Sequence, residues 1–128
     1  MKFKQFLTIN AIMFIPFGIG MLVLPNLIFP MIAVDLDSDG LLMASTVGSM
    51  LLSFGIICFF ARNENAATNS MKAIMIGNLV FHSIDCILTF RGAFSGNMNS
   101  FGYLFSVLHF SFALGFAYYL IKNKHVIN

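Results

Sequence analysis

The stretch MKAIMIGNLVFHSIDCILTFR, residues Met71–Arg91, decides the fold of this chain. It is apolar and long enough to cross the hydrocarbon core of a bilayer, which takes a helix of about 20 residues. Backbone polar groups find no water in that core, so the segment must be a helix. One helix face of this segment collects six residues at alternating spacings of four and three: Met71, Met75, Asn78, His82, Asp85 and Thr89. The last four of them are polar. Such a stripe must face protein or water rather than lipid.

Three further segments are apolar enough to span a bilayer, and short polar stretches separate them. We therefore predict an all-α, integral membrane four-helix bundle. It forms a single domain over residues 1–128, with spans at about 6–24, 40–61, 71–91 and 98–121. The segment Asn26–Val34 lies between Pro25 and the next polar stretch and is too short to span. We expect it to lie at the membrane interface or to pack back on the bundle.

The composition narrows the class of protein. Hydrophobic residues make up 59% of the chain and charged residues 9%, whereas an ordinary globular domain carries roughly 25% charged residues. This excludes a soluble enzyme, a disordered tail and a nucleic-acid-binding protein. The expected partners are the lipid bilayer and other membrane proteins or further copies of the chain, and the expected location is a bacterial inner membrane.

The basic residues of the short loops predict the orientation. One side of the membrane would carry Lys2, Lys4, Arg62, Lys72, Lys122 and Lys124, whereas the other would carry Arg91 together with three aspartates. Both termini are therefore expected in the cytoplasm. His125 would join the basic face on that side.

The other spans offer faces that could meet the stripe of span 71–91. Thr46, Ser49, Ser53 and Ile56 align on the second span, and Gly102, Ser106, His109, Ala113 and Phe116 align on the fourth. At a rise of about 1.5 Å per residue, the histidines, Asp85 and Ser49 reach similar depths near the midplane. We expect a polar layer within the membrane, with His82 bonded to Asp85, made of Thr46, Ser49, Asn78, His82, Asp85 and His109.

Three roles are open for this layer. It can be a polar clasp that holds the helices in register. It can be a proton or ion pathway, because ionisable groups inside membranes often mark one. It can also hold haem or a transition metal between His82 and His109. No resident cofactor and no catalytic residue is predicted. Cys58 and Cys86 lie at different depths, so no disulfide is expected between them.

The loop Asp35-x-Asp37-x-Asp39-Gly40 matches the opening of an EF-hand calcium loop. The twelfth position is Thr46 instead of the bidentate glutamate. Two interpretations follow. The loop binds a cation weakly, or Asp39 or Ser38 caps the second span while the carboxylates favour the positive end of its helix dipole.

The layout resembles the small four-helix bacterial membrane proteins of the DoxX-like kind. The shared features are the basic start, Leu24-Pro25 closing the first span, Gly48 and Gly55 in the second, and Ala61-Arg62-Asn63 at its inner end. The resemblance covers most of the chain as architecture and implies four spans. It transfers no functional residue, because members of such families mostly lack assigned activities.

Three function classes follow from these observations. The first is a non-enzymatic accessory or assembly subunit of a membrane complex, which suits a small chain with no catalytic motif. The second is a small transporter or channel subunit that uses Asp85, His82 and His109. The third is a membrane redox protein that binds haem or a metal at His82 and His109.

Overall fold

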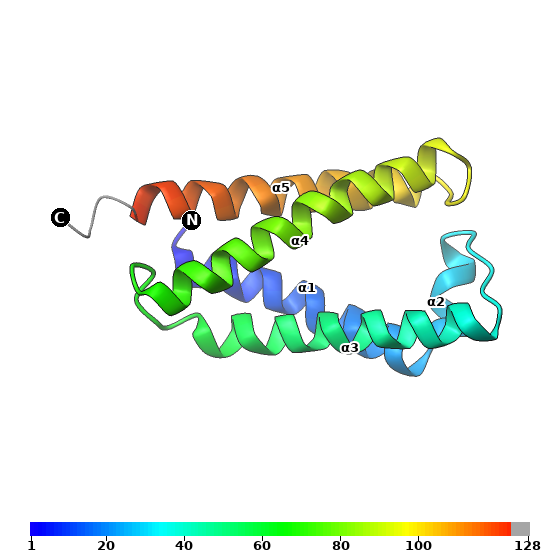
Figure 1. The fold of residues 1–128 in the computed structure, drawn as a ribbon, viewed down its shortest axis with the longest axis horizontal. Coiled ribbons are helices and arrows are strands. Elements are labelled where there is room, and N and C mark those ends of the chain that lie inside the picture. The colour runs from blue at the N-terminus through cyan, green and yellow to red at the C-terminus, as the bar shows by residue number, and fades with distance from the viewer. Residues whose placement is uncertain (124–128) are drawn as a thin grey trace.

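The structure is a computed structural model that describes residues 1–123, and over that range it contains helices and no strands. Five helices follow one another: α1 (Phe3–Val23), α2 (Pro25–Met31), α3 (Ser38–Ala61), α4 (Asn69–Phe94) and α5 (Phe101–Lys122) (Figure 1). All of them except α2 are long and apolar enough to cross a membrane. The all-α fold predicted from the sequence is confirmed. The last residues, among them Lys124 and His125, lie outside the described part of the chain.

The helix ends follow from local residue chemistry. Pro25 begins α2 at a position where its missing N–H costs no helical hydrogen bond. Thr68 caps α4 and accepts a hydrogen bond from the backbone N–H of Met71. Asp37 caps α3, because its Oδ1 accepts from the backbone N–H of Gly40 at 2.8 Å. The expectation that Asp39 or Ser38 caps this helix is wrong. The helix begins two residues earlier than predicted, so both already lie in its first turn.

The long helices form two closely packed pairs, α1 with α3 and α4 with α5 (Figure 1). Glycines allow the close approach within the first pair. A Cβ atom added at Gly48 would lie 2.7 Å from the backbone nitrogen of Leu22 and 2.9 Å from the carbonyl oxygen of Gly18. Small residues permit the same approach between membrane helices in general. Within the second pair, Gly102 lies against Ala93.

The two pairs meet through side chains at the end of the bundle that holds residue 1 and the end of α5. The ring of Phe6 from α1 lies 4.7 Å from the Phe116 ring of α5, measured between centroids. Tyr119 donates a hydrogen bond to the backbone carbonyl of Met1 at 2.7 Å. Both residues 1 and 123 are therefore at this end, which an apolar and aromatic core closes (Figure 1).

At the opposite end, α2 lies between the two pairs. Its last turn is tied to the turn between α4 and α5 by Asn99, whose backbone N–H and side-chain amide donate to the carbonyls of Ile32 and Met31, both at 3.0 Å. Of the two placements expected for residues 26–34, the structure shows the second, because α2 packs back on the bundle.

Candidate functional site

The stripe predicted on α4 faces the interior of the bundle. Met71, Met75, Asn78 and His82 are buried, and Asp85 and Thr89 are half-buried. The opposite face of α4 exposes large apolar side chains such as Ile76, Val80 and Ile84. The spacing of polar residues therefore predicts the orientation of this helix correctly.

A chain of hydrogen bonds runs from α4 to α1, returns to α4 and then reaches α5. It starts at the backbone carbonyl of Ile74, which accepts from Asn78 Nδ2 at 2.9 Å. Asn78 Oδ1 accepts from Asn10 Nδ2 at 3.0 Å. Asn10 Oδ1 lies 2.9 Å from His82 Nε2. His82 Nδ1 lies 2.9 Å from His109 Nδ1. The chain therefore joins both helix pairs near the middle of the bundle.

The carbonyl of Ile74 sets the direction of every bond in this chain. A carbonyl only accepts, so Asn78 must present its amino group to it and its oxygen to Asn10. Asn10 then presents its own oxygen to His82, whose Nε2 must carry a hydrogen. A neutral imidazole has one N–H, so His82 Nδ1 is an acceptor and His109 Nδ1 must donate to it. The remaining nitrogen, His109 Nε2, is left with a lone pair.

That lone pair faces the carboxylate of Asp85. His109 Nε2 lies 3.6 Å from Asp85 Oδ2, which is longer than a hydrogen bond. When both rings are neutral and Asp85 is ionised, two acceptors face each other here and neither supplies a hydrogen. The expected bond between His82 and Asp85 is wrong. His82 already uses both ring nitrogens for Asn10 and His109, so Asp85 has His109 as its partner instead.

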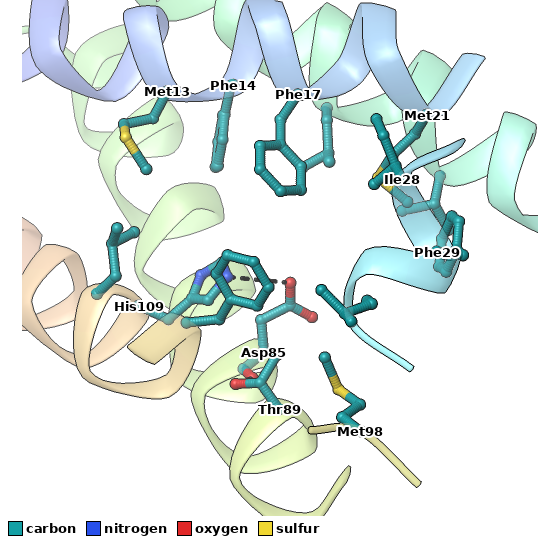
Figure 2. Close-up of a pocket in the computed structure, with 15 residues that line it drawn as sticks. Met13, Phe14, Phe17, Met21, Ile28, Phe29, Asp85, Thr89, Met98 and His109 are labelled. Carbon is teal, nitrogen blue, oxygen red and sulfur yellow. Dashed lines mark hydrogen bonds and ion pairs between the residues drawn. The ribbon is translucent and has the colours of Figure 1, made fainter. Parts of the chain in front are cut away.

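Asp85 and His109 lie on the wall of a cavity of about 170 Å³ between the two helix pairs. All five helices contribute to this cavity, and its other lining residues are apolar apart from Thr89. Figure 2 shows Phe14 and Phe17 of α1 on the wall opposite Asp85 and His109, with Phe29 of α2 to one side. The Asp85 side chain keeps 33% of its surface exposed, so the cavity gives access to the carboxylate.

The other end of the hydrogen-bond chain is closed. Cys58 of α3 accepts from Asn10 Nδ2 at 3.4 Å and lies 3.6 Å from Asn78 Oδ1. Its side chain is fully buried, in the same apolar cluster as Met75 and Phe116. Within residues 1–123 the chain of polar groups ends, away from the cavity, at Cys58 and at the Ile74 carbonyl. It therefore connects the cavity to a closed core and not to the far end of the bundle.

Two residues predicted for the polar layer lie outside it. Thr46 and Ser49 are exposed, and their hydroxyls donate to carbonyls of their own helix, those of Leu42 at 3.0 Å and Thr46 at 2.8 Å. Hydroxyls satisfied in this way need no partner on another helix. The face of α3 that is buried in the bundle is a neighbouring one, with Ala44, Gly48, Leu51, Gly55 and Cys58. Close backbone contact with α1 at Gly48 and Gly55 determines which face of α3 packs against that helix.

The fourth span begins at Phe101 rather than at Met98, but the face that it buries is the predicted one. Gly102, Ser106, Ala113 and Phe116 are buried, and His109 is half-buried. Ser106 donates to the backbone carbonyl of Cys86 at 2.9 Å, which adds a bond between α4 and α5. Cys58 and Cys86 are both free thiols, as expected.

Asn10 is the member of the site that the sequence interpretation missed. Its side chain is fully buried and bonds to His82, Asn78 and Cys58. The available signal was an amide in the otherwise apolar stretch from Phe6 to Leu24. A buried polar group must be paired, so an amide at this depth indicates a partner on another helix.

The metal-site hypotheses find limited geometric support. Asp35, Asp37 and Asp39 are exposed. Within the described part of the chain, no group of three or more His, Cys, Asp or Glu side chains is arranged to hold a metal ion. Both ring nitrogens of His82 are hydrogen-bonded. To bind haem iron or another metal, His82 would have to give up one of those bonds.

Comparisons of the chain with protein-family models, with curated proteins and with solved structures find no match. The functional argument therefore rests on the geometry of the site.

Proposed function

We propose that this chain is a four-span integral membrane protein with both termini in the cytoplasm of a bacterium. We propose further that it serves as a non-enzymatic accessory or assembly subunit of a membrane complex. The membrane placement is supported by four helices of sufficient length and hydropathy. The orientation is supported by the basic residues at the end that holds residue 1, where Lys2, Lys4 and Lys122 lie, against three aspartates at the other end.

One observation carries the choice of an accessory subunit. The side chains of Asn10, Asn78 and His82 satisfy one another in a chain that reaches the buried Cys58. Such a chain holds α1, α4 and α5 together, as hydrogen bonds between membrane helices do, and does not connect the two ends of the bundle. The long helices expose large apolar side chains, among them Ile12, Leu42, Ile87 and Val107. These faces suit lipid or the helices of a partner protein.

Native mass spectrometry of the protein, extracted from its own membranes in mild detergent, tests this proposal. We expect masses well above small multiples of 14.2 kDa, with other polypeptides that the spectra identify. A four-span protein of unrelated function, tagged and extracted in the same way, is the control for polypeptides that co-purify non-specifically. A spectrum that shows only copies of this chain would contradict the accessory role.

A second candidate function is a small transporter or channel subunit. It is favoured by the exposure of Asp85 and His109 to the cavity, because ionisable groups that reach a cavity inside a membrane often mark a path. Proteoliposomes that contain the purified chain would then show proton or cation flux that Asp85→Asn abolishes. Asp39→Asn, which changes an exposed carboxylate outside the cavity, should leave that flux intact. No flux above empty liposomes would contradict this function.

A further inference from the structure

With Asp85 ionised, the cavity between the helix pairs presents two hydrogen-bond acceptors and no matching donor. The direction of the hydrogen-bond chain leaves a lone pair on His109 Nε2, and Asp85 Oδ2 lies 3.6 Å from that nitrogen. The third polar side chain on the wall, Thr89, donates its hydroxyl to the backbone carbonyl of Asp85 at 2.7 Å. A molecule that fills the cavity is therefore best matched when it brings its own hydrogen-bond donors.

The charge of the site also favours a ligand that donates hydrogen bonds. A carboxylate in apolar surroundings is costly unless an opposite charge or a proton compensates it. The one basic group that the structure places beside Asp85 is His109, whose facing nitrogen is an acceptor. The cations Lys72 and Arg91 of α4 are not among the residues that line the cavity. A positively charged ligand would supply the missing charge.

The walls of the cavity define the rest of the ligand. Aromatic rings from three helices surround the polar pair, contributed by Phe14, Phe17, Phe29 and Phe105. Ring faces attract organic cations, and the effect grows when the cation is desolvated. The cavity volume of about 170 Å³ is close to that of the engineered cavity of about 150 Å³ that takes up benzene. The space therefore suits a ligand whose apolar part is about the size of one benzene ring.

We propose that this cavity binds a small lipophilic amine in its ammonium form. The N–H groups would donate to Asp85 and to His109 Nε2, and the apolar body would lie against the phenylalanines. A primary ammonium has three donors, which is enough for both acceptors. A neutral alcohol of the same shape has one donor and no charge. This inference concerns the isolated chain and holds whether or not the protein joins a larger complex.

Isothermal titration calorimetry on the purified protein in nanodiscs tests the proposal with benzylammonium and benzyl alcohol as probes. We expect wild-type protein to bind benzylammonium at least about tenfold more tightly than benzyl alcohol. This comparison needs no variant, so it does not depend on whether a mutant folds. Equal affinities, or no heat of binding with benzylammonium beyond that of empty nanodiscs, would overturn the proposal.

Two variants locate the site. Asp85→Asn keeps the size of the side chain and removes the charge, so it should bring the two affinities within about twofold of each other. Asp39→Asn removes a carboxylate outside the cavity and should behave as wild type. A preference for benzylammonium that survives Asp85→Asn, or that Asp39→Asn abolishes, would also overturn the proposal. Amine binding without proton or cation flux would contradict the transporter function alone, and a native mass spectrum that shows only copies of this chain would contradict the accessory role alone.

Discussion

The Nδ1 atoms of His82 and His109 lie 2.9 Å apart, so the two rings share one hydrogen atom across the gap between α4 and α5. Because Asn10 occupies His82 Nε2, that hydrogen belongs to His109 whenever both rings are neutral. An additional proton on Asp85 or on His109 Nε2 would supply the hydrogen that the contact between these two residues lacks. The polar groups thus form a unit in which the protonation of one member determines the hydrogen bonds of the others.

The tautomers of the two histidines are a direct prediction of this arrangement. In protein whose rings are both neutral, His82 should carry its hydrogen on Nε2 and His109 on Nδ1. Nitrogen-15 chemical shifts of histidine-labelled protein distinguish these tautomers. The variant His125→Gln simplifies assignment, because it removes the one other histidine. Finding the Nε2–H tautomer in both rings would contradict the direction assigned to the chain.

Removal of the Asn10 side chain should destabilise the protein. Asn10→Ala leaves His82 Nε2 without its partner inside a buried site and leaves Asn78 Oδ1 with the Cys58 thiol alone. An unsatisfied buried donor typically costs about 1–3 kcal/mol. Reversible unfolding in detergent micelles measures this change. Thr8→Val is the matched control on the same helix, because the Thr8 hydroxyl is exposed and bonds only to the Lys4 carbonyl. Equal stability of the two variants would argue against a buried role for Asn10.

Two glycine substitutions should have different effects on stability. Gly48→Ala places a methyl group against the backbone of α1, and such overpacking costs about 1–3 kcal/mol. Gly77→Ala meets no atom within 4 Å, so it should leave the stability unchanged or raise it by up to about 1 kcal/mol, through helix propensity. The same unfolding measurement compares them. If Gly48→Ala were as stable as Gly77→Ala, the close packing of α1 on α3 would be wrong.

Two serines, Ser106 buried and Ser49 exposed, should also differ. Ser106→Ala removes the bond from α5 to the Cys86 carbonyl of α4, and we expect a loss of about 0.5–1.5 kcal/mol. Ser49→Ala removes only a bond to a carbonyl of its own helix on an exposed face, so its effect should stay within about 0.5 kcal/mol. A larger loss of stability for Ser49→Ala than for Ser106→Ala would contradict the exposed position of Ser49.

The proposed orientation predicts where reporters become active. A phosphatase, which is active only outside the cytoplasm, should be active when inserted between Asp35 and Asp39 and inactive when fused after Asn128. A fluorescent protein that needs the cytoplasm to fold should show the reverse pattern. The basic residues around Lys2 and Lys122 account for this expectation. An external carboxyl terminus would contradict the four-span topology.

The fold and the α4 stripe could be predicted because both depend on patterns within single helices. Length and hydropathy identify the long helices, and spacing places Asn78, His82 and Asp85 on one face. These patterns do not tell which helix meets which. The partner of Asp85 depends on how α5 sits beside α4, so the sequence suggested His82 three residues away and the structure shows His109.

The orientation of α3 was harder to predict for a similar reason. Serine and threonine hydroxyls can bond to their own helix, so a row of them does not reveal whether a helix face is buried. The glycines Gly48 and Gly55 were the informative residues, because they allow backbones to touch. Asn10 stood alone in an apolar stretch and formed no pattern. Its role emerges only when the side chains of α1 and α4 meet.

The pairing of α1 with α3 and of α4 with α5 has a consequence for biogenesis. Each pair is continuous in the sequence and separated from the other by the linker of residues 62–68. The amino-terminal hairpin can therefore associate while the ribosome is still translating the second one. Two fragments, cut within this linker and co-expressed, could then reconstitute the protein through the interlocking side chains of Asn10, His82 and His109.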